Sequence, residues 1–253
     1  MPQFSDDLFL GAAQTYMGVN INNPLGDPAP MDLGVGPLGR IYVWDVVPLT
    51  KQTNNIALSQ SAVSTQTLTA GTGTTSVVRP DGNTVVQLDC PRAVSITLAA
   101  GSPVNKNYTI TGYDYYGQPM SEVIATGTTG GVTINGKKAF YQVLSASLSG
   151  ATSVAISLGT TDILGIPVRI TDRGYIDNVG WNNVLAEDAA TIVVADTTSP
   201  ATTGTGDVRG TLTPSSAADG TKRLVAAVLL PGLAVGPNAT RLGALGVNQN
   251  LVS

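Results

Sequence analysis

The sequence of 253 residues predicts an all-β fold, an antiparallel β-sandwich of jelly-roll-like type with extended N- and C-terminal arms. Apolar and polar residues alternate with a period of two in several short runs, of which residues 94–98 and 154–158 are the clearest. Turn residues separate these runs at intervals of about 8–12 residues, the spacing of strands in a sandwich or barrel. No amphipathic run of about ten residues competes as a helix, so strands account for the pattern.

Residues 1–58 are predicted to form an extended N-terminal arm. Proline and glycine recur through this segment at a spacing that leaves no room for a helix of useful length. The segment is nevertheless too apolar for a solvated tail, because it carries many Leu, Ile, Val and Met side chains. Such an arm needs a surface to lie on, either the body of its own chain or a neighbouring subunit, and we expect the neighbour.

Residues 59–167 are predicted to form the body of the β-sandwich. The stretch 57–75 is rich in Ser, Thr, Gln and Gly, which is typical of a linker or an edge strand. The strands expected after it cover residues 84–88, 94–98, 108–112, 122–126, 132–134, 140–148 and 154–158. Turns are expected at residues 80–83, 116–119 and 135–136.

Residues 168–253 are predicted to form either a second β unit or the remaining strands of the same sandwich, followed by a C-terminal arm. Gly165, Ile166 and Pro167 interrupt the strand pattern just before this part. Its expected strands cover residues 168–170, 175–184, 191–195, 208–213 and 222–230. Residues 231–253 contain Gly and Leu without strong periodicity, which is typical of a second arm.

The composition argues against nucleic acid and membranes as partners. The 13 Lys and Arg residues are spread thinly and form no basic stripe for phosphate groups. No apolar stretch reaches the ~18 residues of a membrane span. Asp6 and Asp7 stand where a secretory signal carries positive charge, so we expect synthesis in a cytoplasm. The charged fraction of 12% is about half of the usual ~25%, which suits permanent packing against other subunits.

The sequence predicts no catalytic, cofactor-binding or metal-binding residue, and no cofactor. The chain has no histidine, which removes every nucleophile, general base and metal site that depends on imidazole. Cys90 is the only cysteine and is predicted to be a small buried apolar residue. The Gly-rich run 204–207 lacks the lysine and the helix of a phosphate loop, so a turn is predicted there. The Asp residues of the second half lack the spacing of a calcium loop and are interpreted as turn caps. We therefore expect that the protein is not an enzyme.

Several runs of residues resemble tailed-bacteriophage virion structural proteins. They are TITGYDYYGQPMSE at residues 109–122, GKKAF at 136–140, LGT at 158–160, LGIP at 164–167, TGDVRGTLTP at 205–214, ADGTKRL at 218–224 and GRIYVWD at 39–45. Within that group we place the chain among the capsid decoration, or cement, proteins. The resemblance implies a β-sandwich or jelly-roll subunit on the capsid surface of the virion, in a homo-oligomer that is expected to be a homotrimer. It also implies that the subunit bridges neighbouring major capsid proteins and so stabilises the shell.

The subunit contacts are expected in the arm, at Ile41, Tyr42, Val43 and Trp44, because aromatic anchors dominate interface energies. Trp44→Ala is then expected to weaken capsid attachment while leaving the body folded. Two other functions stay open. One is a tail, neck or baseplate structural protein, present in far fewer copies per particle. The other is a host-glycan-binding adhesin with an aromatic patch around residues 113–116.

Overall fold

A computed structural model describes residues 40–61, 64–101, 105–152, 154–184, 186–198 and 200–230. Over these residues the chain is all-β and antiparallel, which confirms the predicted fold class. The strands form a curled nine-stranded sheet and a smaller three-stranded sheet, and a short 3-10 helix covers Arg173–Tyr175. The predicted arm residues 1–39 and 231–253 lie outside the described residues.

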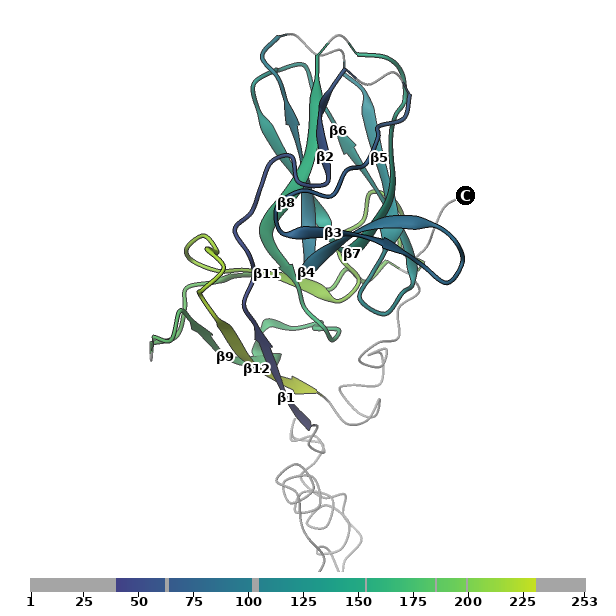
Figure 1. Cartoon of the computed structure of the whole chain (residues 1–253). Coiled ribbons are helices and arrows are strands. Elements are labelled where there is room, and N and C mark those ends of the chain that lie inside the picture. Colours follow the sequence, from purple (N-terminus) through teal and green to yellow (C-terminus); the bar gives the residue numbers. More distant parts are fainter. Residues whose placement is uncertain are drawn as a thin grey trace, which may run out of the picture.

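The nine-stranded sheet makes up the body of the molecule (Figure 1). Its strands are β2 (Ala57–Gln60), β3 (Thr74–Val78), β4 (Thr84–Leu98), β5 (Asn107–Tyr113), β6 (Pro119–Ala125), β7 (Thr133–Leu148), β8 (Ile156–Gly165), β10 (Thr191–Val194) and β11 (Gly210–Thr213). They are ordered β10-β11-β8-β4-β7-β5-β6, with β2 paired to β8 and β3 paired to β4. The stretch predicted as a linker or edge strand therefore contributes β2 and leads into β3.

The long strand β4 shows how the sheet curls. One edge of β4 pairs with β7, while the other pairs first with β3 and then with β8. The register with β7 shifts between Gln87 and Arg92, and Pro91 lies within this irregularity. Because proline has no N–H to donate to a strand ladder, a bulge is where a sheet tolerates it. The irregularity at Pro91 thus divides β4 into two halves, which share β7 on one edge and pair with β3 and β8 respectively on the other.

Two local predictions are wrong. The turn expected at residues 135–136 does not exist, because both residues lie inside β7. Gly136 is needed for a different reason: a Cβ there would lie 2.6 Å from the Glu122 carboxylate. The glycine makes room for a buried side chain and does not form a tight turn. The strand expected at residues 168–170 is not a strand in the structure.

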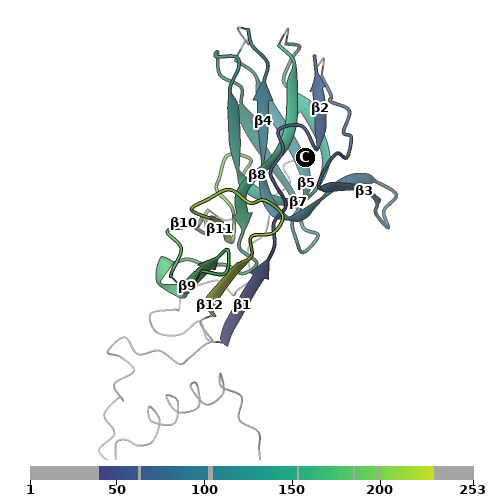
Figure 2. The same ribbon diagram turned by 60° about the vertical axis from the view of Figure 1, so that its left-hand side comes forward.

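The three-stranded sheet joins segments that are far apart in the sequence (Figures 1 and 2). It is ordered β1-β12-β9, with β1 at Arg40–Val46, β9 at Ile176–Trp181 and β12 at Leu224–Leu230. β1 belongs to the predicted arm, yet it pairs with β12 of the same chain over its whole length. Residues after 168 supply strands to both sheets, so they complete the body and also build the small sheet.

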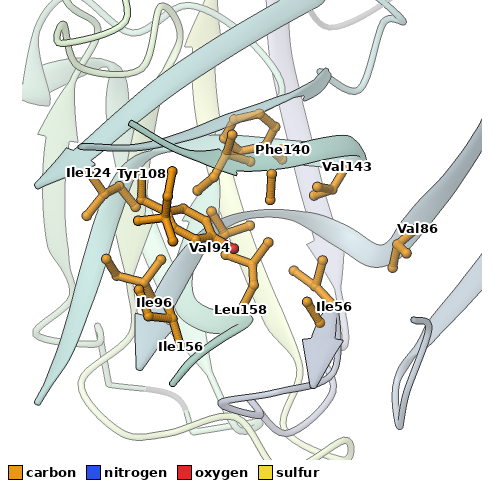
Figure 3. Packing of buried hydrophobic residues seen from close by; sticks show 14 of the residues in the cluster. Ile56, Val86, Val94, Ile96, Tyr108, Ile124, Phe140, Val143, Ile156 and Leu158 are labelled. Carbon is orange, nitrogen blue, oxygen red and sulfur yellow. The ribbon is translucent and has the colours of Figure 1, made fainter. Parts of the chain in front are cut away.

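Two large clusters of buried apolar side chains stabilise the structure. The first fills the curled sheet, and Figure 3 labels among its fully buried members Ile96, Tyr108, Phe140, Ile156 and Leu158. The second joins the small sheet to the adjoining end of the body and includes Trp44, Trp181, Leu164 and Leu212. The small sheet is therefore packed onto the body through its own apolar cluster.

A close backbone approach holds the segment between β1 and β2 against β8. The Thr160 N–H donates to the Gln52 carbonyl oxygen at 2.8 Å, and the Ser157 hydroxyl donates to the Thr53 carbonyl at 2.9 Å. Gly159 lies between these bonds, and a Cβ there would stand 2.0 Å from the Gln52 oxygen. Only glycine allows this approach, which fixes where the chain leaves β1 and enters the body.

Candidate interaction surfaces

The small sheet turns one face outward, and two of the four predicted contact residues lie on it. Side chains alternate across a strand, so Ile41 and Val43 of β1 point away from the body while Tyr42 and Trp44 point towards it. Ile41 is 53% exposed and Val43 is 61% exposed. On β12, Leu229 lies opposite Ile41 and continues the same face. The predicted contact residues are thus divided between the two faces of one strand.

On β1 and β12 this outward face consists of Ile41, Val43, Val225, Ala227 and Leu229, and on β9 it continues through Gly180 and the exposed polar residue Asn178. The part on β1 and β12 is apolar, and it ends at an ion pair between Asp45 and Arg223. The hydrogen bond from Arg223 lowers the pKa of Asp45 from its usual value. Asp45 and Arg223 neutralise each other at the end of this row of apolar side chains. The apolar side chains can therefore contact an apolar surface without burying either charge.

Trp44 is not available as an exposed anchor. Its side chain is 8% exposed and belongs to the second core cluster, together with Trp181 and Leu224. Its predicted role as a contact residue is therefore replaced by a role inside the chain, where it holds the small sheet on the body. Trp44→Ala would disturb that packing, so this variant cannot test attachment alone.

A cleft of about 350 Å³ runs beside β1, between the small sheet and the body. The consecutive residues 42–46 of β1 line one side, and Tyr115, Tyr141 and Pro167 line the other. Since residues from both faces of the strand take part, the cleft follows the backbone edge of β1. Within the described ranges β1 is an edge strand, paired only with β12. The cleft therefore offers backbone hydrogen-bonding groups along β1, and the rest of its lining combines aromatic rings with Asp89, Cys90 and Pro91 of β4.

Tyrosine rings make the wall of the cleft opposite β1 partly aromatic. The Tyr115 ring meets the Tyr116 ring edge-on with centroids 5.3 Å apart, and it meets the Tyr141 ring at 5.5 Å. The Tyr116 hydroxyl donates to the Pro167 carbonyl at 2.7 Å, and the Arg209 guanidinium lies 5.3 Å from the centre of its ring. Burial raises the pKa of Tyr116, so its hydroxyl stays a donor. Tyr115 is 51% exposed and is the ring most open to a partner.

The aromatic patch expected at residues 113–116 is divided in the structure. Tyr113 carries the Arg79 guanidinium over its ring at 3.6 Å, whereas Tyr115 lines the cleft and Tyr116 packs edge-on against it. Tyr141 was missed, because only the pairing of β5 with β7 brings it to the other tyrosines. The residues next to Tyr141 in the sequence do not indicate that its ring lies beside Tyr115.

A buried carboxylate, Glu122, joins β6 to β7. Its oxygens accept hydrogen bonds from the backbone N–H groups of Lys137 at 2.5 Å and Lys138 at 3.3 Å. The side chain is 3% exposed. Burial raises the pKa of Glu122 to about 7, against the opposing effect of the two N–H groups and the Lys138 ammonium. A carboxyl group with this pKa changes its charge near neutral pH.

A second buried carboxylate, Asp207, holds the turn before β11 against β7. Its oxygens accept hydrogen bonds from the backbone N–H groups of Ala139 at 2.9 Å and Arg209 at 2.8 Å. The Arg209 side chain pairs in turn with buried Asp114 at 2.8 Å. Burial raises the pKa of Asp207. The bond to Arg209 confirms Asp207 as a turn cap, while its bond to β7 was not predicted.

The other residues considered for chemistry have structural roles. Cys90 is 5% exposed, and burial raises its pKa to about 12, which confirms it as a buried residue. Asp172, Asp196 and Asp219 each accept a backbone N–H bond from two residues further on, which confirms them as turn caps. In the part of the chain that the structure describes, no three His, Cys, Asp or Glu side chains gather as metal ligands.

Comparison with protein-family models, curated proteins and solved structures found no match. Among the described residues, no helix has the length and apolar character needed to cross a membrane. Two surfaces of the described chain are candidates for contact with a partner, the outward face of the small sheet and the cleft beside β1.

Proposed function

We propose that this protein is a structural component of a tailed-phage virion that binds the outer surface of the capsid and bridges neighbouring major capsid proteins. The observation that supports this most is the outward face of the small sheet, which exposes Ile41, Val43 and Val225 together. Contiguous exposed apolar side chains mark surfaces that bind other proteins. The resemblance of the sequence to virion proteins supplies the class of partner.

The outward face suits a permanent contact because its side chains are already held in place. Seven residue pairs hold β1 against β12, so the backbone beneath the face is ordered before any partner arrives. Branched Ile and Val side chains have few rotamers to lose on binding. A preorganised apolar face keeps the entropic cost of association low.

The composition and the chain path support assembly into a lattice of subunits. The charged fraction is only 12%, so extended contacts bury few charges. Arg40 and Leu230 are paired, and the segments 1–39 and 231–253 join the described residues at this pair. Contacts by these segments would start beside the outward face and add to its affinity by multivalency. We propose that subunits made in the host cytoplasm assemble on the shell as homo-oligomers, with a trimer as the expected form.

The double variant Ile41→Thr, Val43→Thr tests the proposal. Threonine keeps the branched shape that suits a strand, but its hydroxyl costs about 1–3 kcal/mol to bury without a partner. We expect attachment to shells of the major capsid protein, measured by co-sedimentation, to weaken by at least about tenfold.

Val78→Thr is the matched control, because Val78 is 68% exposed on β3 and does not belong to the outward face. It should attach to shells as the unchanged protein does. Equal attachment by the double variant and the control would count against the outward face as the capsid contact.

A further inference from the structure

Another cleft, of about 590 Å³, lies on the body and shares no lining residue with the cleft beside β1. Its volume is within the range of sites that bind small molecules. Nine of its fourteen lining residues carry a hydroxyl or an amide group, and the other five are Lys51, Asp162, Ile163, Pro214 and Ala217. We call it the polar cleft, because hydrogen-bonding side chains dominate its lining.

A bulge in β8 brings an acidic side chain into the polar cleft. In the ladder between β4 and β8, three residues of β8, 161–163, face only Ala93 of β4. The Thr161 hydroxyl holds this bulge, because it donates to the Ala93 carbonyl at 2.8 Å and accepts from the Ile163 N–H at 3.1 Å. A bulge interrupts the regular alternation of a strand and redirects its side chains. Asp162, at the middle of the bulge, lines the cleft.

Two segments flank the bulge and complete the polar cleft. One contains Lys51 and Thr53, between β1 and β2. The other is residues 213–217, which follow the two pairs that join β11 to β8. On the neighbouring strands, Ser95 of β4 lies opposite Asn135 of β7, and both line the cleft. These polar side chains come from separate parts of the chain, and the folded sheet brings them together.

Asp162 supplies a hydrogen-bond acceptor to the polar cleft. One of its oxygens, Oδ2, lies 3.0 Å from the Lys51 ammonium nitrogen. The other oxygen, Oδ1, is buried and accepts no hydrogen bond from the residues that the structure describes. A buried carboxylate oxygen without a donor is unfavourable, since it has lost its water. A hydroxyl group of a ligand would satisfy it through a charge-assisted hydrogen bond.

Ser216 supplies a hydrogen-bond donor to the same cleft. Its oxygen accepts hydrogen bonds from the Trp181 indole N–H at 2.9 Å and from the Lys222 ammonium at 3.2 Å. These bonds use both lone pairs of the hydroxyl oxygen, so its hydrogen can donate to a further acceptor. Trp181 is buried in the second core cluster and thereby fixes the position of Ser216. The polar cleft thus presents an acceptor and a donor that are both held by the fold.

The charges of the polar cleft favour a neutral ligand with many hydroxyl groups. Lys51 and Asp162 neutralise each other, so the cleft attracts neither an anion nor a cation by net charge. An apolar ligand would cover the hydroxyl groups of the lining without giving them hydrogen bonds, which is unfavourable. A hydroxyl group of a ligand can both donate and accept. Among polyhydroxyl compounds a sugar ring is rigid, so it loses little conformational entropy on binding.

We propose that the polar cleft binds a short neutral saccharide. A sugar hydroxyl donates to Asp162 Oδ1, the Ser216 hydroxyl donates to a sugar oxygen, and C–H groups of the sugar ring pack against Ile163 and Ala217. The proposal does not depend on attachment to a capsid. It also uses none of the tyrosines at residues 113–116, around which an aromatic patch was expected.

Titration of the full chain with simple sugars, followed through its amide signals by nuclear magnetic resonance, tests the proposal. The probes are the methyl glycosides of glucose, galactose, mannose and N-acetylglucosamine, which are all neutral. At least one of them should shift the amide signals of residues 160–163 and 215–217, with a Kd of about 10 mM or lower. Shifts confined to other parts of the chain, or no shift with any probe at about five times that concentration, would overturn the proposal.

Two variants and a control locate the ligand. Asp162→Asn replaces the charged acceptor with a neutral amide, so the Kd should rise at least about tenfold. Asp81→Asn makes the same change in an exposed turn outside the cleft, and the Kd should stay within about twofold. Ala217→Trp fills the cleft from an exposed position and leaves the ion pair in place, so it should abolish binding even if Asp162→Asn does not fold. Equal Kd values for Asp162→Asn and Asp81→Asn, or unchanged binding by Ala217→Trp, would contradict the proposed site.

Discussion

Glu122 shows how a single buried residue can depend on distant sequence. It points into the body from β6, and its carboxylate accepts N–H bonds from Lys137 and Lys138 of β7. Gly136 leaves the space that the carboxylate fills. Burial disfavours the charged form and raises the pKa to about 7, so the protonated form is favoured in the folded state compared with the unfolded chain.

This pKa predicts a pH dependence of stability. The folded pKa of Glu122 lies above its ordinary value of 4.5, so the free energy of unfolding falls as the pH rises from about 4.5 to about 7. The loss amounts to roughly 3 kcal/mol, since one unit of pKa is worth about 1.4 kcal/mol. Glu122→Gln cannot ionise, and we expect its free energy of unfolding to be flatter between pH 5 and pH 8. Urea unfolding of both proteins at each pH measures the difference.

Asp219→Asn is the control for this experiment. Backbone N–H bonds from Thr221 and Lys222 lower the pKa of Asp219 to about 2, so its charge does not change between pH 5 and pH 8. The control should follow the pH dependence of the unchanged protein. Parallel curves for Glu122→Gln and the unchanged protein would show that Glu122 does not titrate in this range.

For single residues, the sequence predicts the roles that depend on neighbours along the chain. It does not predict the roles that depend on contacts with residues far away in the sequence. Asp219 is recognisable as a turn cap, because its bonds go to residues two and three positions away. Cys90 is recognisable as buried from its apolar surroundings. Gly136 is mistaken for a turn residue, because its reason lies fourteen residues away at Glu122. The exposed Tyr115 was identified, while its partner Tyr141 was not.

The alternation of apolar and polar residues predicts that a strand exists. It does not predict which other strand that strand pairs with. The runs predicted around residues 94–98, 108–112 and 140–148 all lie within strands of the body. The pairing of β1 with β12 brings Arg40 opposite Leu230, a separation along the chain that no periodicity encodes. Residues 40–46 therefore read as part of an arm, although they are a strand of the folded molecule.

Trp44→Ala tests whether β1 is built into the fold. The Trp44 side chain fills the second core cluster, and deletion of a buried tryptophan side chain costs about 3–5 kcal/mol of unfolding free energy. Ile41→Ala, on the exposed face of the same strand, should change that free energy by no more than about 0.5 kcal/mol. Denaturant unfolding measures both. If the two variants are equally stable, β1 is not packed on the body as described.

In the molecule as a whole, both candidate contact surfaces belong to the small sheet or border it. Its outward face carries apolar side chains that no other described residue covers, and its inner face and the β1 edge, unpaired within the described ranges, meet the body and the tyrosine-lined cleft. With a charged fraction of 12%, the chain relies on neutral polar and small residues for the rest of its surface. These properties are the ones we expect of the proposed virion subunit, which would contact other proteins over large areas.

We propose that the protein is a capsid component, and its number of copies in each particle distinguishes this role from the alternatives. Quantitative gel analysis of purified virions, with the major capsid protein as the internal standard, measures this number. A decoration protein predicts a copy number comparable with that of the major capsid protein. Far fewer copies would indicate a tail, neck or baseplate part, and complete absence from purified particles would contradict a structural role in the virion.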